Sequence, residues 1–451
     1  MVIRLRRPLL AQALLFISLI GALGFLEYST LVALRFEEFA ELCTLLLFSW
    51  LAASTKVVSA RTPYVFLPAL GMVLFVLVYA YVFTLRTGAD LLPSIFAQRY
   101  FVFVLLGPIV YLLSVRGWEP ADFRRIFIFA MLTAAAGYVA YDVTLAPKSA
   151  LLSGQFFVLQ LGSSYLEAGA ELRRLNAVSV FLLLYFAGRL LQARRPLPFA
   201  SLVVGVSALL LVVTIPRALL ASAGVALILY AVFLRRPGRA GLTMIMLPLY
   251  GFIAALLSPY LRDAFIGAFS SDISYEVRIV EVQRAWQVIL EYPLLGFGQD
   301  SEQSLSYQDV FGHLYPGDIG LLGVTFQFGL VGLALYLVFV AWLCTNLLRL
   351  VWAHAAAGVS PKQRLFVWTL FIICFMFLVA SPLQARYIIP QGQGLPIGAV
   401  SWGLLMAYRH GLIDVGTARN TGPSPRSTLI PAGATVHRGT IRGDGDSPLP
   451  Q

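Results

Sequence analysis

Twelve apolar runs, each long enough to cross a bilayer, constrain the fold of this chain more than any other feature. A membrane-spanning helix needs about 20 apolar residues, and its backbone hydrogen bonds must close within the segment. With 59% hydrophobic and 12% charged residues, the 451-residue chain has more apolar surface than a soluble core could bury. The sequence therefore predicts an all-α polytopic membrane protein with about twelve spans, at 8–25, 38–55, 63–84, 99–115, 124–145, 175–192, 198–215, 217–234, 241–257, 320–345, 363–381 and 392–408.

The basic residues predict how these spans are oriented, because lysine and arginine favour cytoplasmic loops. If the N-terminal arginines lie inside, the N-terminal segment, the cytoplasmic loops and the C-terminal tail together hold 22 of the 33 basic residues. We therefore expect both termini in the cytoplasm. The net charge of +11 then reflects topology, and no nucleic acid is expected as a partner.

The chain divides into one membrane domain, about 1–410, and a C-terminal tail, 411–451. The tail is rich in Gly, Pro, Ser and Thr with almost no aromatic residues, so we expect it to be disordered in the cytoplasm. Cys43, Cys344 and Cys374 fall within apolar runs, which indicates packing residues rather than disulfides or a metal cluster.

A long hydrophilic stretch, 258–319, interrupts the apolar runs before the tenth span and is expected to be periplasmic. Within it, 275–291 is predicted to be an amphipathic helix lying on the outer membrane surface with its apolar stripe toward lipid. Pro293 ends this helix and Gly296-Phe297-Gly298 forms a turn. The stripe consists of Tyr275, Ile279, Val282, Trp286, Ile289 and Leu290.

Four segments together resemble the O-antigen ligase and O-antigen polymerase family of bacterial membrane glycosyltransferases. They are Thr214-Ile215-Pro216-Arg217, where the family usually has Ser-Arg; Arg278 at the head of the amphipathic helix; Pro293-Leu294-Leu295-Gly296-Phe297-Gly298, similar to the family's Pro-x-x-Gly-x-Gly turn; and Phe326-Gln327-Phe328-Gly329-Leu330-Val331-Gly332, similar to its Glu-x-Gly-Leu-x-Gly. The resemblance covers about 214–345, and the twelve spans with a late outer loop agree with it.

The chain departs from the ligases of this family at one place. Those ligases carry a His-Asn pair about eleven residues before the Glu-x-Gly glycine, whereas here Asp318 lies eleven residues before Gly329. His313 lies five residues earlier than Asp318. Either the loop carries a small insertion or the acid has replaced the imidazole, which leaves a polymerase-type enzyme open.

The resemblance implies an inner-membrane glycosyltransferase with no cofactor and no metal. Its partners would be a glycan on a polyprenyl diphosphate, an acceptor glycan or glycolipid (lipid A core or a growing polysaccharide), and the surrounding membrane lipid. Such an enzyme must hold anionic oxygens and remove a proton from the acceptor hydroxyl. Arginine suits the first task because its planar fork binds phosphate bidentately, and histidine or a carboxylate suits the second.

The candidate site residues follow from these two tasks. Arg217 and Arg278 are expected to bind the diphosphate, with Arg284 and Arg386 as lesser candidates, and Asp318 or His313 to orient or deprotonate the acceptor. Each has a structural alternative: a snorkelling or solvated arginine, a solvated loop histidine, or an aspartate that caps the tenth span.

Two other functions compete with this hypothesis. Twelve spans also suit a secondary transporter or polyprenyl-lipid flippase, but the span centres are almost free of charge and the polar residues gather at one face, which favours surface chemistry. A non-catalytic partner in a polysaccharide synthesis complex is the third reading, and it would tolerate alanine at Arg217, Arg278, His313 and Asp318.

Overall fold

The computed structural model of the chain describes residues 9–23, 36–55, 63–96, 98–145, 176–193, 197–214, 273–299, 307–312, 314–356, 359–380 and 394–413. Every regular element in these ranges is a helix, so the all-α prediction is confirmed for the described part of the chain. The elements are α1 (Leu9–Ala22), α2 (Phe36–Ser54), α3 (Pro63–Thr87), α4 (Leu91–Phe96), η1 (Arg99–Leu105), α5 (Leu106–Val115), α6 (Pro120–Leu145), α8 (Asn176–Gln192), α9 (Pro198–Thr214), α13 (Ile273–Glu291), α14 (Tyr307–Phe311), η3 (Pro316–Asp318), α15 (Gly320–Ala356), α16 (Pro361–Ala380) and α17 (Gly394–Arg409).

These helices coincide with ten of the twelve predicted spans; the runs at 217–234 and 241–257 lie outside the described residues. Two described helices, Tyr64–Thr87 and Gly320–His354, are long and apolar enough to cross a membrane by themselves. Shorter apolar helices occupy Leu9–Ala22, Phe101–Val115, Val178–Gln192 and Pro198–Ala208. The count of twelve spans stays a prediction. The disorder expected for the tail also stays a prediction, because residues 414–451 lie outside the described residues.

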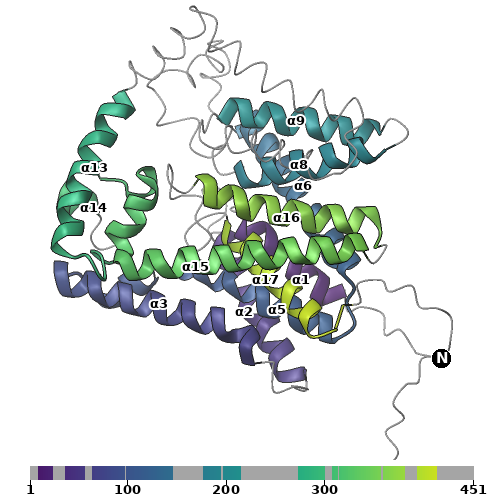
Figure 1. Ribbon diagram of the computed structural model, residues 1–451, viewed down its shortest axis with the longest axis horizontal. Helices are drawn as coiled ribbons and strands as arrows, with labels where there is room; N and C mark the ends of the chain where they lie inside the picture. Colours follow the sequence, from purple (N-terminus) through teal and green to yellow (C-terminus); the bar gives the residue numbers. More distant parts are fainter. Residues whose placement is uncertain are drawn as a thin grey trace, which may run out of the picture.

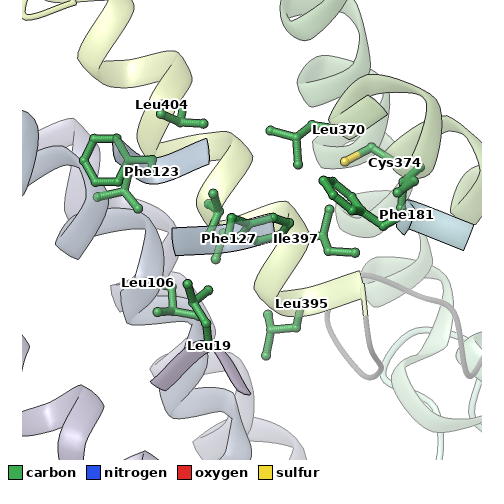
Figure 2. Packing of buried hydrophobic residues seen from close by; sticks show 14 of the residues in the cluster. Leu19, Leu106, Phe123, Phe127, Phe181, Leu370, Cys374, Leu395, Ile397 and Leu404 are labelled. Carbon is green, nitrogen blue, oxygen red and sulfur yellow. The ribbon is translucent and has the colours of Figure 1, made fainter. Parts of the chain in front are cut away.

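The main core lies where α1, α5, α6, α8, α16 and α17 meet. Figure 2 shows Phe127 of α6, Ile397 of α17 and Leu106 of α5 among side chains of the neighbouring helices, and all three are almost fully buried. Close helix contact at α5 and α17 depends on small residues: a Cβ at Gly403 would lie 2.3 Å from the Gly107 carbonyl oxygen. Such small-residue contacts are typical of helices packed within a membrane.

The free cysteines Cys43, Cys344 and Cys374 are buried, in agreement with the packing role predicted for them. Along α3, by contrast, large apolar side chains stay exposed, as they do on part of α15. Exposed apolar faces of this extent fit contact with lipid. They include Leu67, Leu70, Leu74, Leu77, Leu335 and Val338.

A second, smaller core lies at one end of the long helices. In Figure 1, α13 rises steeply from the end where α3 and α15 meet, and α14 lies against it. Residues of this cluster come from α3, α13, α14, the 293–299 segment, the residues flanking η3 and the first turns of α15. Its members are Phe83, Ala285, Val288, Ile289, Phe297, Tyr307, Leu314, Ile319 and Phe326.

Candidate functional site

Two of the motif segments meet at this second core. The 293–298 turn, which follows α13, lies against residues 326–331 of α15, and we call this pair of segments the junction. Four backbone hydrogen bonds join them: Phe297 N to Phe326 O (2.6 Å), Gly298 N to Gln327 O (2.9 Å), Leu330 N to Pro293 O (2.8 Å) and Val331 N to Leu294 O (3.2 Å). Segments about 30 residues apart in sequence therefore act as one structural unit.

The junction interrupts α15 at Gly329, whose φ of 62° and ψ of −172° are not helical. In a continuous helix the N–H groups of Leu330 and Val331 would bind the carbonyls of Phe326 and Gln327. Here two carbonyls of the turn accept hydrogen bonds from these N–H groups instead, and two N–H groups of the turn donate to these carbonyls. These four backbone groups are thus paired, as an interrupted helix within an apolar environment requires.

Glycine is required on both sides of the junction because the two backbones touch. Gly296 and Gly329 each have a φ of 62°, a region that other L-residues rarely adopt. A Cβ at Gly296 would lie 2.4 Å from the Gly329 nitrogen, and one at Gly329 would lie 2.1 Å from the Leu294 carbonyl oxygen. Both motif glycines therefore shape the junction, which is the role expected for Gly296.

Helix α3 packs against a third side of the junction, a contact that no sequence motif predicts. The Tyr79 hydroxyl donates to the Phe328 carbonyl (2.8 Å), and the Gln299 N–H donates to the Tyr79 carbonyl (3.3 Å). Phe83 is fully buried in the second core, and the Arg86 guanidinium lies over the Tyr292 ring at 3.8 Å. The spacing of Tyr79, Phe83 and Arg86 on one helical face is visible in the sequence, but their partner segment is not.

The amphipathic helix α13 carries apolar residues on two faces rather than one. Of the predicted apolar stripe, Ile279, Val282, Trp286 and Leu290 are exposed, as lipid contact requires, whereas Ile289 is buried in the second core. The face that packs on the protein is a different one, and the hydrophobic pattern does not reveal it because it includes an acidic residue. Its members are Glu281, Ala285, Val288 and Ile289.

Glu281 and Arg284 of α13 hold the loop that leads from α14 into α15. The buried Glu281 carboxylate accepts a hydrogen bond from the Tyr315 N–H (3.0 Å), and Arg284 Nη1 donates to the Phe311 carbonyl (2.5 Å). Gly323 of α15 packs on the same loop, since a Cβ there would lie 1.8 Å from the Pro316 oxygen. Phe311, Tyr315 and Pro316, the described residues of this loop that make these contacts, are thereby bound to α13 and α15.

The structure places three of the six predicted site residues on elements around the junction. Arg284 is described in full, and its guanidinium already binds the loop carbonyl. Arg278 belongs to α13 and Asp318 ends η3, but their side chains lie outside the described part. Arg217, His313 and Arg386 lie outside the described residues, so the meeting of Arg217 with Arg278 stays a prediction.

The charge state of Tyr292 bears on the arginine above it. A hydrogen bond with the neighbouring Glu291 is the main cause that raises the pKa of the Tyr292 hydroxyl above its ordinary value. The hydroxyl is therefore neutral near pH 7, and Tyr292 offers Arg86 the face of an aromatic ring rather than a negative charge.

The described part of the chain is thus an all-helical protein built on long apolar helices, with a glycine-dependent junction beside a loop bound to α13 and α15. A family model described as O-antigen ligase matches residues 202–337, which include α13, the turn and the kink of α15. The match confirms the resemblance indicated by the motifs to a family of membrane-integral, glycosyltransferase-like O-antigen ligases and polymerases. Among curated proteins no match to the chain is found.

Proposed function

We propose that this protein is an O-antigen ligase/polymerase-type glycosyltransferase of the bacterial inner membrane. It transfers a polyprenyl-diphosphate-linked glycan onto an acceptor hydroxyl, on lipid A core or on a growing polysaccharide, at the periplasmic face. Twelve spans with both termini in the cytoplasm would place residues 258–319 on that face. The observation that carries the proposal is the family match over 202–337, because both segments of the junction fall inside it.

The reaction needs no energy source beyond the donor itself. The acceptor oxygen attacks the anomeric carbon, the bond from that carbon to the diphosphate oxygen breaks, and the diphosphate leaves with the electron pair. The negative charge that grows on the leaving group requires fixed cations, which Arg217 and Arg278 supply in this proposal. Arg284 and Arg386 are secondary candidates for the same role.

Asp318 or His313 receives the proton of the acceptor hydroxyl. Both belong to the segment that Glu281, Arg284 and Gly323 surround with fixed contacts. Contacts at Phe311, Tyr315 and Pro316 bind the described residues of this segment to α13 and α15, and proton transfer in a transition state requires a closely positioned base. These contacts support the assignment of a base to this segment without distinguishing the two residues.

Transfer by purified protein from a lipid-linked oligosaccharide tests the proposal. We expect Arg217→Ala to lower kcat about 100-fold or more, the usual effect of removing a group that stabilises transition-state charge. Arg349→Ala, which removes an exposed arginine from the far part of α15, is the matched control and should retain activity. Full transfer by Arg217→Ala would refute the assigned role, and gradient-driven lipid movement without glycosidic bond formation would instead identify a transporter.

A further inference from the structure

Arg86, near the end of α3, is the one arginine of the described residues that lies against the junction without a bonded polar partner there. Its guanidinium carbon lies 3.8 Å from the centre of the Tyr292 ring and 5.8 Å from that of Phe297. Phe297 is a motif residue of the turn, and Tyr292 directly precedes the motif proline. The guanidinium therefore lies at the turn itself.

The position of its nitrogen atoms distinguishes Arg86 from a snorkelling arginine. Nη1 is buried and has no hydrogen-bond partner within the described part of the chain. An arginine that only carried its charge to water would expose that nitrogen. A buried guanidinium nitrogen without a partner is costly, and the cost is relieved when an anion supplies the missing acceptor.

Two other polar side chains beside the turn are in the same condition. Thr84 Oγ1 and Gln299 Oε1 are buried without a hydrogen-bond partner in the ranges that the structure describes. Thr84 follows Phe83 in the chain, and Gly298 lies against the Phe83 backbone. The backbone N–H of Gln299 donates to the Tyr79 carbonyl of α3. Unused donors and acceptors thus gather where α3 meets the turn.

The nearby acid forms no direct bond with Arg86. Glu291 attracts the Arg86 guanidinium electrostatically, but it is exposed and forms no ion pair with Arg86 in the described part of the chain, and Tyr292 is uncharged near pH 7. Two other arginines show the contrast. Arg99 pairs with Glu38 at 3.1 Å, and Arg116, which lies over Trp50 at 4.6 Å, donates to the hydroxyls of Ser54 and Thr55.

We propose that Arg86 is a further substrate-binding residue that holds a phosphate group at the head of a lipid, with Tyr292 and Phe297 fixing the plane of its guanidinium. This inference rests on the proposed function, which makes the donor diphosphate that group. The Tyr292 ring lies over the guanidinium carbon, so phosphate oxygens would have to approach the edge of the group, through which arginine binds phosphate bidentately. A site so formed would place the diphosphate against the turn.

Binding of polyprenyl diphosphate to the purified full chain in detergent, measured without any acceptor, tests this assignment. We expect Arg86→Gln to weaken binding about 10- to 100-fold, and Arg86→Lys to weaken it less because the charge is kept but not the fork. Tyr292→Leu should weaken binding and Tyr292→Phe should not, since phenylalanine keeps the ring. Arg116→Gln, which removes the arginine stacked on Trp50, is the matched control and should bind like wild type.

The same titration with phosphatidylglycerol identifies the source of the phosphate. Unchanged binding of phosphatidylglycerol by Arg86→Gln, with loss of polyprenyl diphosphate, supports a donor site, whereas equal loss of both lipids overturns it in favour of a general headgroup site. Wild-type affinity of a folded Arg86→Gln variant for polyprenyl diphosphate overturns the inference outright. If wild type binds the diphosphate through Arg86 yet transfers no sugar, the proposed function fails and the binding site stands.

Discussion

At the scale of single residues, Glu281 shows how a charged side chain can position a neighbouring loop. It is almost fully buried on α13, and its carboxylate binds the Tyr315 N–H of the loop that carries the candidate bases. Carboxylates that accept from backbone N–H groups form stronger hydrogen bonds than neutral acceptors do. In the proposed function, Glu281 would therefore act through the position of the loop rather than on the substrate.

We expect Glu281→Ala to loosen this loop, because the Tyr315 N–H loses its acceptor at a cost of about 1–3 kcal/mol. Glu281→Gln keeps an acceptor oxygen and should cost less. Hydrogen exchange of the 307–318 segment checks the expectation: exchange should quicken in Glu281→Ala and stay near wild type in Glu281→Gln. Equal protection in both variants and wild type would show that the contact does not hold the loop.

At the scale of elements, the junction is the feature on which the outer assembly depends. The turn completes the interrupted hydrogen bonding of α15, and α3 lies against both segments through Tyr79 and Phe83. The exchange of hydrogen bonds explains why both segments carry glycine, since neither backbone could approach the other past a Cβ. The motifs are thus two halves of one contact.

Gly329→Ala is expected to lower the free energy of unfolding by about 3 kcal/mol or more, because it adds both an overlap and an unfavourable φ. Gly71→Ala is its control: Gly71 lies within α3, and a Cβ there would meet nothing within 4 Å. Thermal unfolding in detergent should show a lower Tm for Gly329→Ala alone. Equal Tm values for the two variants would contradict the role given to the junction.

At the scale of the whole molecule, the described chain carries arginines at both ends. The junction end carries Arg86 and Arg284, together with the loop that Glu281 and Arg284 bind. At the opposite end Arg124 Nη1 donates to Gln363 (3.2 Å) and Arg409 Nη2 donates to Asn346 (2.5 Å). The predicted topology places the first end in the periplasm and the second in the cytoplasm.

Cysteine labelling in intact cells tests this orientation. The native cysteines are buried, so single added cysteines can be read without removing them. We expect a membrane-impermeant thiol reagent to label Gln287→Cys on the exposed side of α13 and to label Lys362→Cys only after the cells are permeabilised, since both positions are exposed. The reverse pattern would invert the topology and remove the proposed periplasmic site.

The sequence predicted the helices well because apolar runs of this length have one stable form in lipid. It also indicated the turn at Pro293–Gly298 and the exposed stripe of α13. The contacts of α3 with the turn could not be predicted, because the pairing of Phe83 with Gly298 depends on tertiary packing across more than 200 residues. Glu281 was missed because an acid on a buried helical face contradicts the hydrophobic pattern, and its partner N–H belongs to a distant loop.

The broken helix α15 has a consequence for biogenesis. Residues 293–298 are synthesised before α15, so in the predicted topology this segment is already across the membrane when α15 enters it. The exchange at Gly329 leaves each of the donors and acceptors concerned paired, so α15 can insert as an ordinary continuous helix and open later without losing bonds. Assembly of the outer region is then a late step, decided by the fit of side chains after the spans are in place.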